Sequence, residues 1–487
     1  MMTHGSAWLG RVSLIFLVFI LAGCIKNPVT GGRQLALIGE GQEIEIGKAS
    51  HPEILQEFGA VDNPALQEYF SRIGLEIARI SHRPNLPWQF TVLDTDVVNA
   101  FAVPGGFVYF TRGILSYMNN EAELAGVLGH EIGHITARHS VTQMSQQQLL
   151  GLGLGLGSVL SPTFGRLSNL AGTGLGILML KYSRDHERQS DQLGVQYSAL
   201  AGYDPAQMGK FFEVFVTMRE TEGDAIPNWL SSHPAPPDRI KATEDAAVRT
   251  KNEGPKREYR INSEEFLPRL AGLIYGENPR EGFVDGRRFV HPDLRFQMDV
   301  PEGWKVQNSR SAVVLAEPQG NAVVKLTLVP KEEGQTPETI GQKIGSRQGV
   351  ELVEGSSLSI HGNQAYLGRY RMQADQTSIG VLAAFVLYGG QVYQIAGLTP
   401  ESAYSRASGL FNSVLRSFRE LADPGILKVQ PDRIRIYRCK GGESLRSIAG
   451  STAKSRITLE DLSRLNRLDP DRTLAAGTIV KLVTLGR

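Results

Sequence analysis

The segment His130-Glu131-Ile132-Gly133-His134 constrains this chain most strongly, because its spacing implies both a local structure and a chemistry. On an α-helix, residues i and i+4 share one face, so both imidazoles can reach the same metal ion. Glu131 is rotated by about 100° from His130, which leaves its carboxylate free to act on metal-bound water. The segment is typical of helices that bind zinc in hydrolases.

The residues around this segment predict a helix. Asn119 and Asn120 can cap its start, and acidic residues follow in the first turn. Residues 122–141 contain no proline and keep apolar side chains at helical spacing. We therefore expect both histidines in the middle of one helix. A solvent-exposed helix that carries two histidines without a metal is the alternative.

A second spaced pair offers the remaining ligand. Catalytic zinc sites use three protein ligands and keep a fourth position for water. Glu187 and Asp191 are four residues apart, so a second helix would present both carboxylates on one face. One carboxylate can bind the metal while the other accepts a hydrogen bond from a ligand imidazole.

Several motifs follow in the same order as in the gluzincin metallopeptidases of the Ste24/HtpX type, family M48. The resemblance runs from about residue 27 to residue 274 and points to the bacterial periplasmic lipoprotein branch. It implies a mainly helical zincin-type domain with a small sheet. The motifs are Asn-Pro-Val-Thr-Gly at 27–31, Asn-Ala-Phe-Ala-Val-Pro-Gly-Gly at 99–106, the pairs at 130/134 and 187/191, Ala-Gly-Tyr-Asp-Pro at 201–205 and Ser-His-Pro at 232–234.

Residue by residue, the resemblance implies one zinc ion per chain, bound by His130, His134 and Glu187. Glu131 would be the general base, and Asp191 would be the carboxylate that orients a ligand histidine. The implied activity is cleavage of peptide bonds by zinc-bound water that Glu131 deprotonates.

Three other histidines lie near these motifs in the sequence. His233 corresponds to a family position close to the metal, where it could donate a hydrogen bond to the oxyanion or bind zinc as a fourth ligand. A loop histidine stiffened by the neighbouring prolines is the alternative. His139 lies five residues past His134, which rotates it off the ligand face of a continuous helix, and His186 neighbours Glu187 on a different face. Both are expected at the surface or behind the ligands.

A strand is the candidate for holding the substrate. Residues 89–93 and 107–110 are rich in aromatic and β-branched side chains and are predicted strands, with a Pro-Gly-Gly turn between them. In zinc peptidases of this general build, an edge strand pairs with an extended peptide through backbone hydrogen bonds. A hairpin that only supports the helix is the alternative. The resemblance favours substrate binding by Asn99, Ala100, Phe101 and Ala102.

The N-terminus predicts a lipoprotein signal peptide over residues 1–23. Arg11 precedes an apolar run of residues 12–22, which is shorter than the about 20 residues needed to span a bilayer. The small residues before Cys24 resemble a lipoprotein signal-peptidase site, so Cys24 would be acylated. Ile25 after it resembles the sorting pattern for the Gram-negative outer membrane. We expect a lipid anchor on the periplasmic side of that membrane; a buried N-terminal helix is the alternative.

A glycine-rich interval separates the two predicted ligand helices. Residues 149–160 and 169–180 are apolar and rich in glycine, and each stretch is too short for a usual membrane span. Pro162 and Arg166 lie between them. We interpret the interval as a mobile flap over the cleft. A buried helical hairpin and a membrane-inserting hairpin are the alternatives.

The remainder of the chain predicts further domains. A length of 487 residues suggests two to four of them, and the net charge of +1 gives no basic surface for nucleic acid. The predicted order is a peptidase domain over 24–284, an α+β domain with a mostly antiparallel sheet over 285–424, and a small βααβ module over 432–487. The second loosely resembles PsbP-like domains at residues 300–304, and the third resembles a LysM module. Glu443 and Ser444 replace the usual Asp-Thr of that module, so its binding of peptidoglycan stays open.

Together these patterns predict an α+β, zinc-dependent endopeptidase that acts on misfolded or stalled envelope proteins. Its expected partners are a protein or peptide substrate, the membrane through Cys24, and peptidoglycan through the C-terminal module. The alternatives are a non-proteolytic chaperone or assembly factor for outer-membrane proteins, and a lipoprotein that tethers peptidoglycan.

Overall fold

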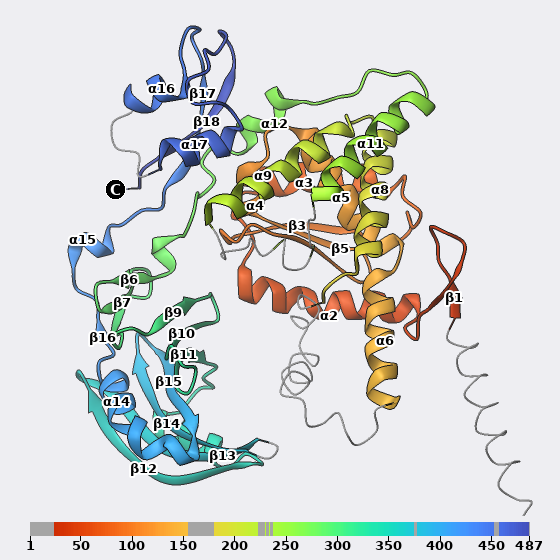
Figure 1. Cartoon of the computed structure of the whole chain (residues 1–487). Helices are drawn as coiled ribbons and strands as arrows, with labels where there is room; N and C mark the ends of the chain where they lie inside the picture. Colours follow the sequence, from red (N-terminus) through yellow and green to blue (C-terminus); the bar gives the residue numbers. More distant parts are fainter. Residues whose placement is uncertain are drawn as a thin grey trace, which may run out of the picture. The chain divides into compact units, whose positions relative to one another are not determined.

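The chain forms two compact units in the computed structural model, which are described separately (Figure 1). Unit 1 comprises Met1–Gly276 and Asp432–Leu485, and unit 2 comprises Glu277–Pro431 with Gly486–Arg487. The predicted signal peptide and most of the glycine-rich interval lie outside the described residues. Among the helices described, none is both long and apolar enough to cross a membrane. The structure describes residues 24–153, 180–222, 229, 233, 237–374, 377–451 and 457–486.

Unit 1 is mainly helical around one large apolar core. Phe70, Phe110, Leu128 and Phe211 are buried in that core and come from four different elements. α12 (Ser263–Arg269) is short, because Pro268 and the glycines after it do not continue a helix. The helices are α2 (Glu40–Phe58), α3 (Pro64–Ala78), α4 (Arg112–Tyr117), α5 (Glu121–Thr136), α6 (His139–Gly153), α8 (Arg184–Leu200), α9 (Ala206–Glu222), α11 (Pro237–Glu253) and α12 (Ser263–Arg269).

A three-stranded sheet lies between α2 and the helices that include α3 and α5 (Figure 1). It consists of β3 (Gln89–Leu93), β4 (Ala100–Val103) and β5 (Phe107–Thr111) in the order β3-β5-β4. β4 and β5 are joined through Gly105 and Gly106, whose positive φ angles of 90° and 107° suit glycine. β3 is parallel to β5, so the hairpin is formed by β4 and β5, and β4 is an edge strand. A further pair is formed by β1 (Cys24–Lys26) and β2 (Arg33–Leu35).

The predicted helix over residues 122–141 is interrupted. α5 ends at Thr136, Arg138 takes the left-handed conformation with a φ of 60°, and α6 begins at His139. The side chain of Arg138 pairs with buried Glu43, which also accepts a hydrogen bond of 2.7 Å from Arg83. The Glu43 carboxylate, paired with both arginines, thus stabilises the interruption between α5 and α6. Helical periodicity in the sequence does not predict this interruption.

The C-terminal segment of unit 1 contacts the start of α5. Its elements are β17 (Arg433–Arg438), α16 (Leu445–Ser451), α17 (Leu459–Asn466) and β18 (Ile479–Thr484), with β17 antiparallel to β18. Lys481 is fully buried and donates hydrogen bonds to the carbonyls of Ser116, at 2.5 Å, and Met118, at 2.8 Å. Arg467 pairs with Glu123 in the first turn of α5. Arg467 of this segment therefore supplies a positive charge to the first turn of α5, and Lys481 contacts the chain just before it.

Unit 2 is built on a seven-stranded antiparallel sheet in the order β12-β13-β14-β15-β11-β10-β9. The α+β class is therefore confirmed, with a helical region and small sheet followed by a large antiparallel sheet. The long strand β12 is mostly exposed, and its burial alternates only weakly along the strand. The sheet contains β9 (Lys305–Asn308), β10 (Ala312–Ala316), β11 (Val323–Val329), β12 (Val350–Ile360), β13 (Asn363–Ala374), β14 (Thr377–Tyr388) and β15 (Gln391–Pro400), with helices α13 (Pro337–Gly345) and α14 (Tyr404–Arg416).

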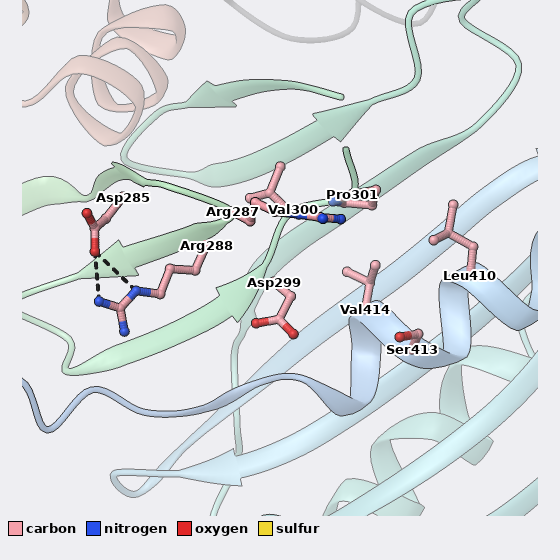
Figure 2. Close-up of a pocket in the computed structure, with 9 residues that line it drawn as sticks. All are labelled: Asp285, Arg287, Arg288, Asp299, Val300, Pro301, Leu410, Ser413 and Val414. Atoms are coloured by element: carbon pink, nitrogen blue, oxygen red, sulfur yellow. Dashed lines mark hydrogen bonds and ion pairs between the residues drawn. The ribbon is translucent and has the colours of Figure 1, made fainter. Parts of the chain in front are cut away.

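A second, smaller sheet of unit 2 borders a pocket of about 430 Å³ (Figure 2). The charged side chains there are engaged with one another or with neighbours: Arg288 donates to Asp285 at 2.7 Å, and Asp299 accepts from Arg419 at 3.0 Å. Leu410 of α14 lies on its apolar side. This sheet contains β6 (Phe283–Asp285), β7 (Arg288–His291), β8 (Phe296–Asp299) and β16 (Arg419–Glu420).

Candidate metal centre

Close packing of α5 against α8 brings the two spaced pairs together (Figure 1). A Cβ atom on Gly129 would lie 3.0 Å from the Cα atom of Gly194, and a Cβ atom on Gly194 would lie 2.9 Å from the carbonyl oxygen of Gly126. Larger residues at these positions would push the helices apart, because protein interiors leave no room for added methyl groups. The glycines therefore set the distance across which the α8 carboxylates meet the α5 histidines.

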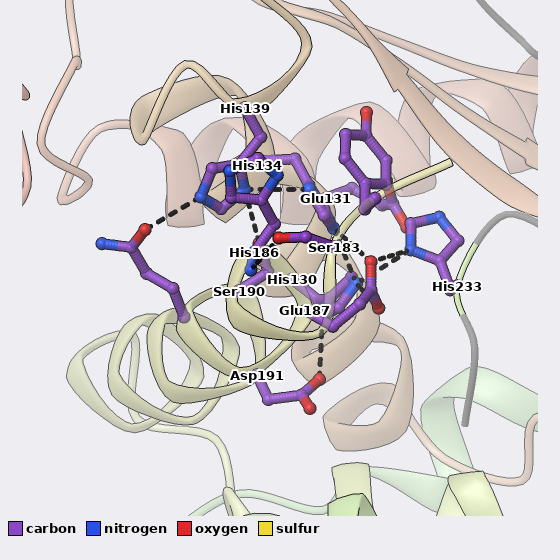
Figure 3. A network of polar contacts seen from close by, with 12 residues as sticks. His130, Glu131, His134, His139, Ser183, His186, Glu187, Ser190, Asp191 and His233 are labelled. Carbon is purple, nitrogen blue, oxygen red and sulfur yellow. Dashed lines mark hydrogen bonds and ion pairs between the residues drawn. The ribbon is translucent and has the colours of Figure 1, made fainter. Parts of the chain in front are cut away.

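Four buried side chains converge where the helices meet (Figure 3). His130, His134, Glu187 and His233 each offer one ligand atom, and these atoms lie within 4.8 Å of one another. The Nε2 atoms of His130 and His134 are 3.1 Å apart. The Glu187 carboxylate lies 3.7 Å from the first and 3.4 Å from the second. The structure thus brings the three expected ligands and His233 into one cluster.

The ring of His130 is oriented by a carboxylate. Its Nδ1 atom lies 3.0 Å from Asp191, the position expected for such a partner. Arg239 lies 2.7 Å from both Asp191 and Glu187 and is itself buried. Burial alone would raise the pKa of Asp191, but the Arg239 guanidinium and His130 outweigh it and lower that pKa. Asp191 therefore stays ionised and can accept the Nδ1–H of His130.

Glu131 faces the cluster from the adjacent position on α5. It is fully buried, and its Oε1 atom lies 3.7 Å from Nε2 of His233. Burial raises the pKa of Glu131, an effect that His233 and His130 only partly offset. A carboxylate with a raised pKa is suited to take up a proton and to give it back.

His233 lies between the two carboxylates. Its Nδ1 atom is 2.9 Å from Glu187 and 3.4 Å from Nε2 of His130. Its ring stacks on Trp229 with the ring centroids 5.1 Å apart. Burial alone would lower the pKa of His233, but Glu187 and Glu131 outweigh it and raise that pKa.

The chemistry of these donors fits zinc. Two imidazole nitrogens and one carboxylate oxygen form the ligand set of several zinc peptidases. The other ring nitrogen of each motif histidine is already occupied, by Asp191 for His130 and by His139 for His134. Both Nε2 atoms are therefore left to face the ion. Burial and the neighbouring histidines hold the pKa of His134 well below its usual value, which favours the neutral form that binds metal.

Comparison with known proteins agrees with this geometry. Residues 64–247 match the model of peptidase family M48. The matched region is therefore similar to that peptidase family. Its expected metal-binding side chains are all present in this chain.

Curated relatives match less than half of the chain. A beta-barrel assembly-enhancing protease of Escherichia coli (strain K12) is 30% identical over 224 residues, which are 44% of this chain and 45% of the relative. The mitochondrial metalloendopeptidase OMA1 of Arabidopsis thaliana is 29% identical over 218 residues, 44% of this chain and 42% of the relative. The chain thus spans less than half the length of these relatives. The solved structure of PsbP (CyanoP) from Synechocystis sp. PCC 6803 is 17% identical and covers 28% of this chain and 98% of that chain, and its TM-score of 0.24 is too low to support an interpretation.

The expected substrate-binding residues lie at the edge strand β4 and are not among the four clustered side chains. Asn99 precedes β4, and its carbonyl accepts a hydrogen bond of 3.0 Å from the backbone N–H of Thr111. Ala100 and Ala102 belong to the core that includes α5, whereas Phe101 packs in the cluster that includes α2. Side chains on both faces of the strand are therefore buried, and pairing with a peptide would use the backbone of its outer edge.

Two residues of the candidate metal centre were not expected from the sequence. Arg239 supplies the positive charge that two buried carboxylates need, and the only sequence signal was a cation shortly after His233. Trp229 packs against His233. Its position four residues before that histidine was the sequence feature that could have indicated this contact. His139 was expected at the surface or behind the ligands, and of these two positions it takes the second: it is buried 3.1 Å from His134, next to the helix break at Arg138.

Proposed function

We propose that this chain is a zinc-dependent endopeptidase. The observation that supports this most directly is the convergence of His130, His134 and Glu187, with Glu131 beside them. Zinc held there would make water more acidic and polarise a substrate carbonyl. Glu131 is placed to take the proton of the attacking water and to return it to the departing amine. Asp191 and Arg239 keep the ligands in position.

The substrate class proposed is unfolded protein of the bacterial envelope. The name of the Escherichia coli relative, which refers to β-barrel assembly, supports an envelope setting. Acylation of Cys24 would anchor the chain to the outer membrane after removal of residues 1–23, and the sequence before Cys24 supports this. The βααβ order of residues 432–487 supports a LysM-like module that contacts peptidoglycan. An extended substrate would pair with the outer edge of β4, beside Asn99.

Metal analysis together with proteolysis tests the proposed activity. We expect about one zinc ion per chain and cleavage of unfolded casein that a zinc chelator abolishes and added zinc restores. A protein purified without zinc that cannot take it up, or cleavage that is insensitive to the chelator, would contradict the proposal. Binding of unfolded protein without cleavage would favour the chaperone alternative.

We propose that His233 regulates this site as a fourth protein ligand. Its Nδ1 atom lies among the other ligand atoms, whereas its Nε2 atom faces Glu131. A ligand in the fourth position would compete with water, so His233→Ala is expected to keep zinc and to increase cleavage of casein. A fall of about 10²–10³-fold would instead indicate that His233 stabilises the oxyanion. Initial rates at equal zinc content decide between these roles.

A further inference from the structure

We propose that His139 is a positioning residue for His134. It accepts a hydrogen bond from the Nδ1–H group of His134 and so turns the Nε2 atom of His134 toward the metal. This inference rests on the proposed zinc site. It assigns a role to a side chain that, on a continuous helix, would point away from the ligands.

The hydrogen bonds around His139 fix which nitrogens carry protons. Nε2 of His139 lies 2.8 Å from the amide oxygen of Gln189, which can only accept a hydrogen bond. Nε2 of His139 therefore carries the hydrogen, and its Nδ1 atom is an acceptor. That Nδ1 atom lies 3.1 Å from Nδ1 of His134, while the hydroxyl of Ser190 is more distant, at 3.4 Å. His134 must then be protonated on Nδ1, which leaves its Nε2 atom bare.

The direction of the bare nitrogen agrees with metal binding. Nε2 of His134 lies 3.1 Å from Nε2 of His130 and 3.4 Å from Glu187, so it points into the ligand cluster. Ligand histidines need such a partner on the other nitrogen, because it fixes both the tautomer and the ring plane. In this chain the series Gln189, His139, His134 supplies it for one of the two motif histidines.

The two motif histidines have partners of different charge. His130 is held by the carboxylate of Asp191, which Arg239 supports. His134 is held by a neutral imidazole, which an amide supports. A second carboxylate beside His134 would place another negative charge in a fully buried site, and such a charge is costly without its own cation. His139 provides the acceptor without that charge.

The break between α5 and α6 makes this contact possible. On an unbroken helix a residue five positions on is rotated by about 140° from the first, which would carry His139 away from His134. The left-handed conformation of Arg138 turns the chain back toward the ligands, and buried Glu43 holds the Arg138 side chain. The ring of His186 stacks on His139 with centroids 4.2 Å apart and limits its rotation.

Zinc affinity of three full-length variants tests this role. His139→Leu removes the acceptor and is expected to weaken zinc binding by about 10–100-fold in competition with a chelator. His139→Asn keeps an acceptor oxygen near the position of Nδ1 and is expected to recover most of the affinity. His51→Leu is the matched control, since this histidine of α2 bonds to Tyr109 at 2.8 Å and is not among the clustered side chains, so the affinity is expected to stay unchanged. Thermal unfolding of the metal-free proteins verifies that each variant is folded.

The outcomes separate this inference from the proposed function. Wild-type protein that binds no zinc overturns the proposed function itself. A folded His139→Leu variant with wild-type zinc affinity overturns the role of His139 alone, as does an equal loss in His139→Leu and His139→Asn. If His139→Leu does not fold, Gln189→Leu takes its place, because Gln189 is only half-buried and fixes the His139 tautomer. Wild-type affinity in that variant would also overturn the role.

Discussion

The Glu131→Gln variant is expected to keep its zinc and to lose proteolysis by about 10²–10⁴-fold. Glutamine has nearly the same shape as glutamate, so the packing around this fully buried position is preserved. It cannot take a proton from water, however, and that is the step assigned to Glu131. Metal binding is retained because Glu131 is not among the four side chains that converge on the metal position. Zinc content and initial rates of casein cleavage measure the two effects separately.

A control makes this result specific to position 131. Glu213→Gln changes the same type of side chain at an exposed position of α9 in the same unit, and we expect wild-type rates from it. Cleavage by Glu131→Gln at the wild-type rate would remove the general-base assignment. Loss of zinc from Glu131→Gln would mean that this carboxylate contributes to metal binding.

Helical periodicity predicted the two residue pairs of the candidate ligand cluster, whereas the choice of Glu187 over Asp191 as ligand came from the resemblance to the M48 family. His130 with His134 and Glu187 with Asp191 are pairs at i and i+4, and each pair shares a face on any helix. The pairing of the two helices is favoured by chemistry, since two imidazoles need an additional ligand. The order of the strands in the sheet could not be predicted in the same way. The sequence predicted β3 and β5, but their parallel pairing and the edge position of β4 depend on contacts between residues far apart in the sequence.

Asp191 was predicted as an orienting residue, but the orienting contacts of His139 and Arg239 were not, because they depend on contacts between distant segments. His139 reaches His134 only because Arg138 binds Glu43, which lies on α2 far back in the sequence. Arg239 is on α11 and becomes part of the site only when two carboxylates of α8 are buried against it. Periodicity within one helix carries no information on either contact. The ligands are thus local features, whereas their orientation is a property of the tertiary fold.

The Glu187→Gln variant is expected to lose more than about 100-fold in zinc affinity. This loss is larger than the loss of about 10–100-fold expected when a residue that orients a ligand histidine is removed. An amide oxygen carries no charge and is a poorer zinc ligand than a carboxylate. The shape of the side chain is conserved, and Arg239 keeps its pair with Asp191, so the unit is expected to fold. Proteolysis should fall with the metal content and return in part at high zinc concentration. Competition with a chelator gives the affinity, and casein cleavage over a zinc titration gives the recovery.

A control on the same helix separates ligand loss from a general effect of charge. Asp185→Asn also removes one negative charge from the first turn of α8, but this side chain is 90% exposed and pairs with Arg188 at 3.2 Å. We expect its zinc affinity to equal that of the wild type. Zinc bound by Glu187→Gln as tightly as by Asp185→Asn would exclude Glu187 from the ligand set. Since only two imidazoles and His233 would then remain, the site would be a histidine site, and the match to a peptidase centre with two histidines and a glutamate would fail.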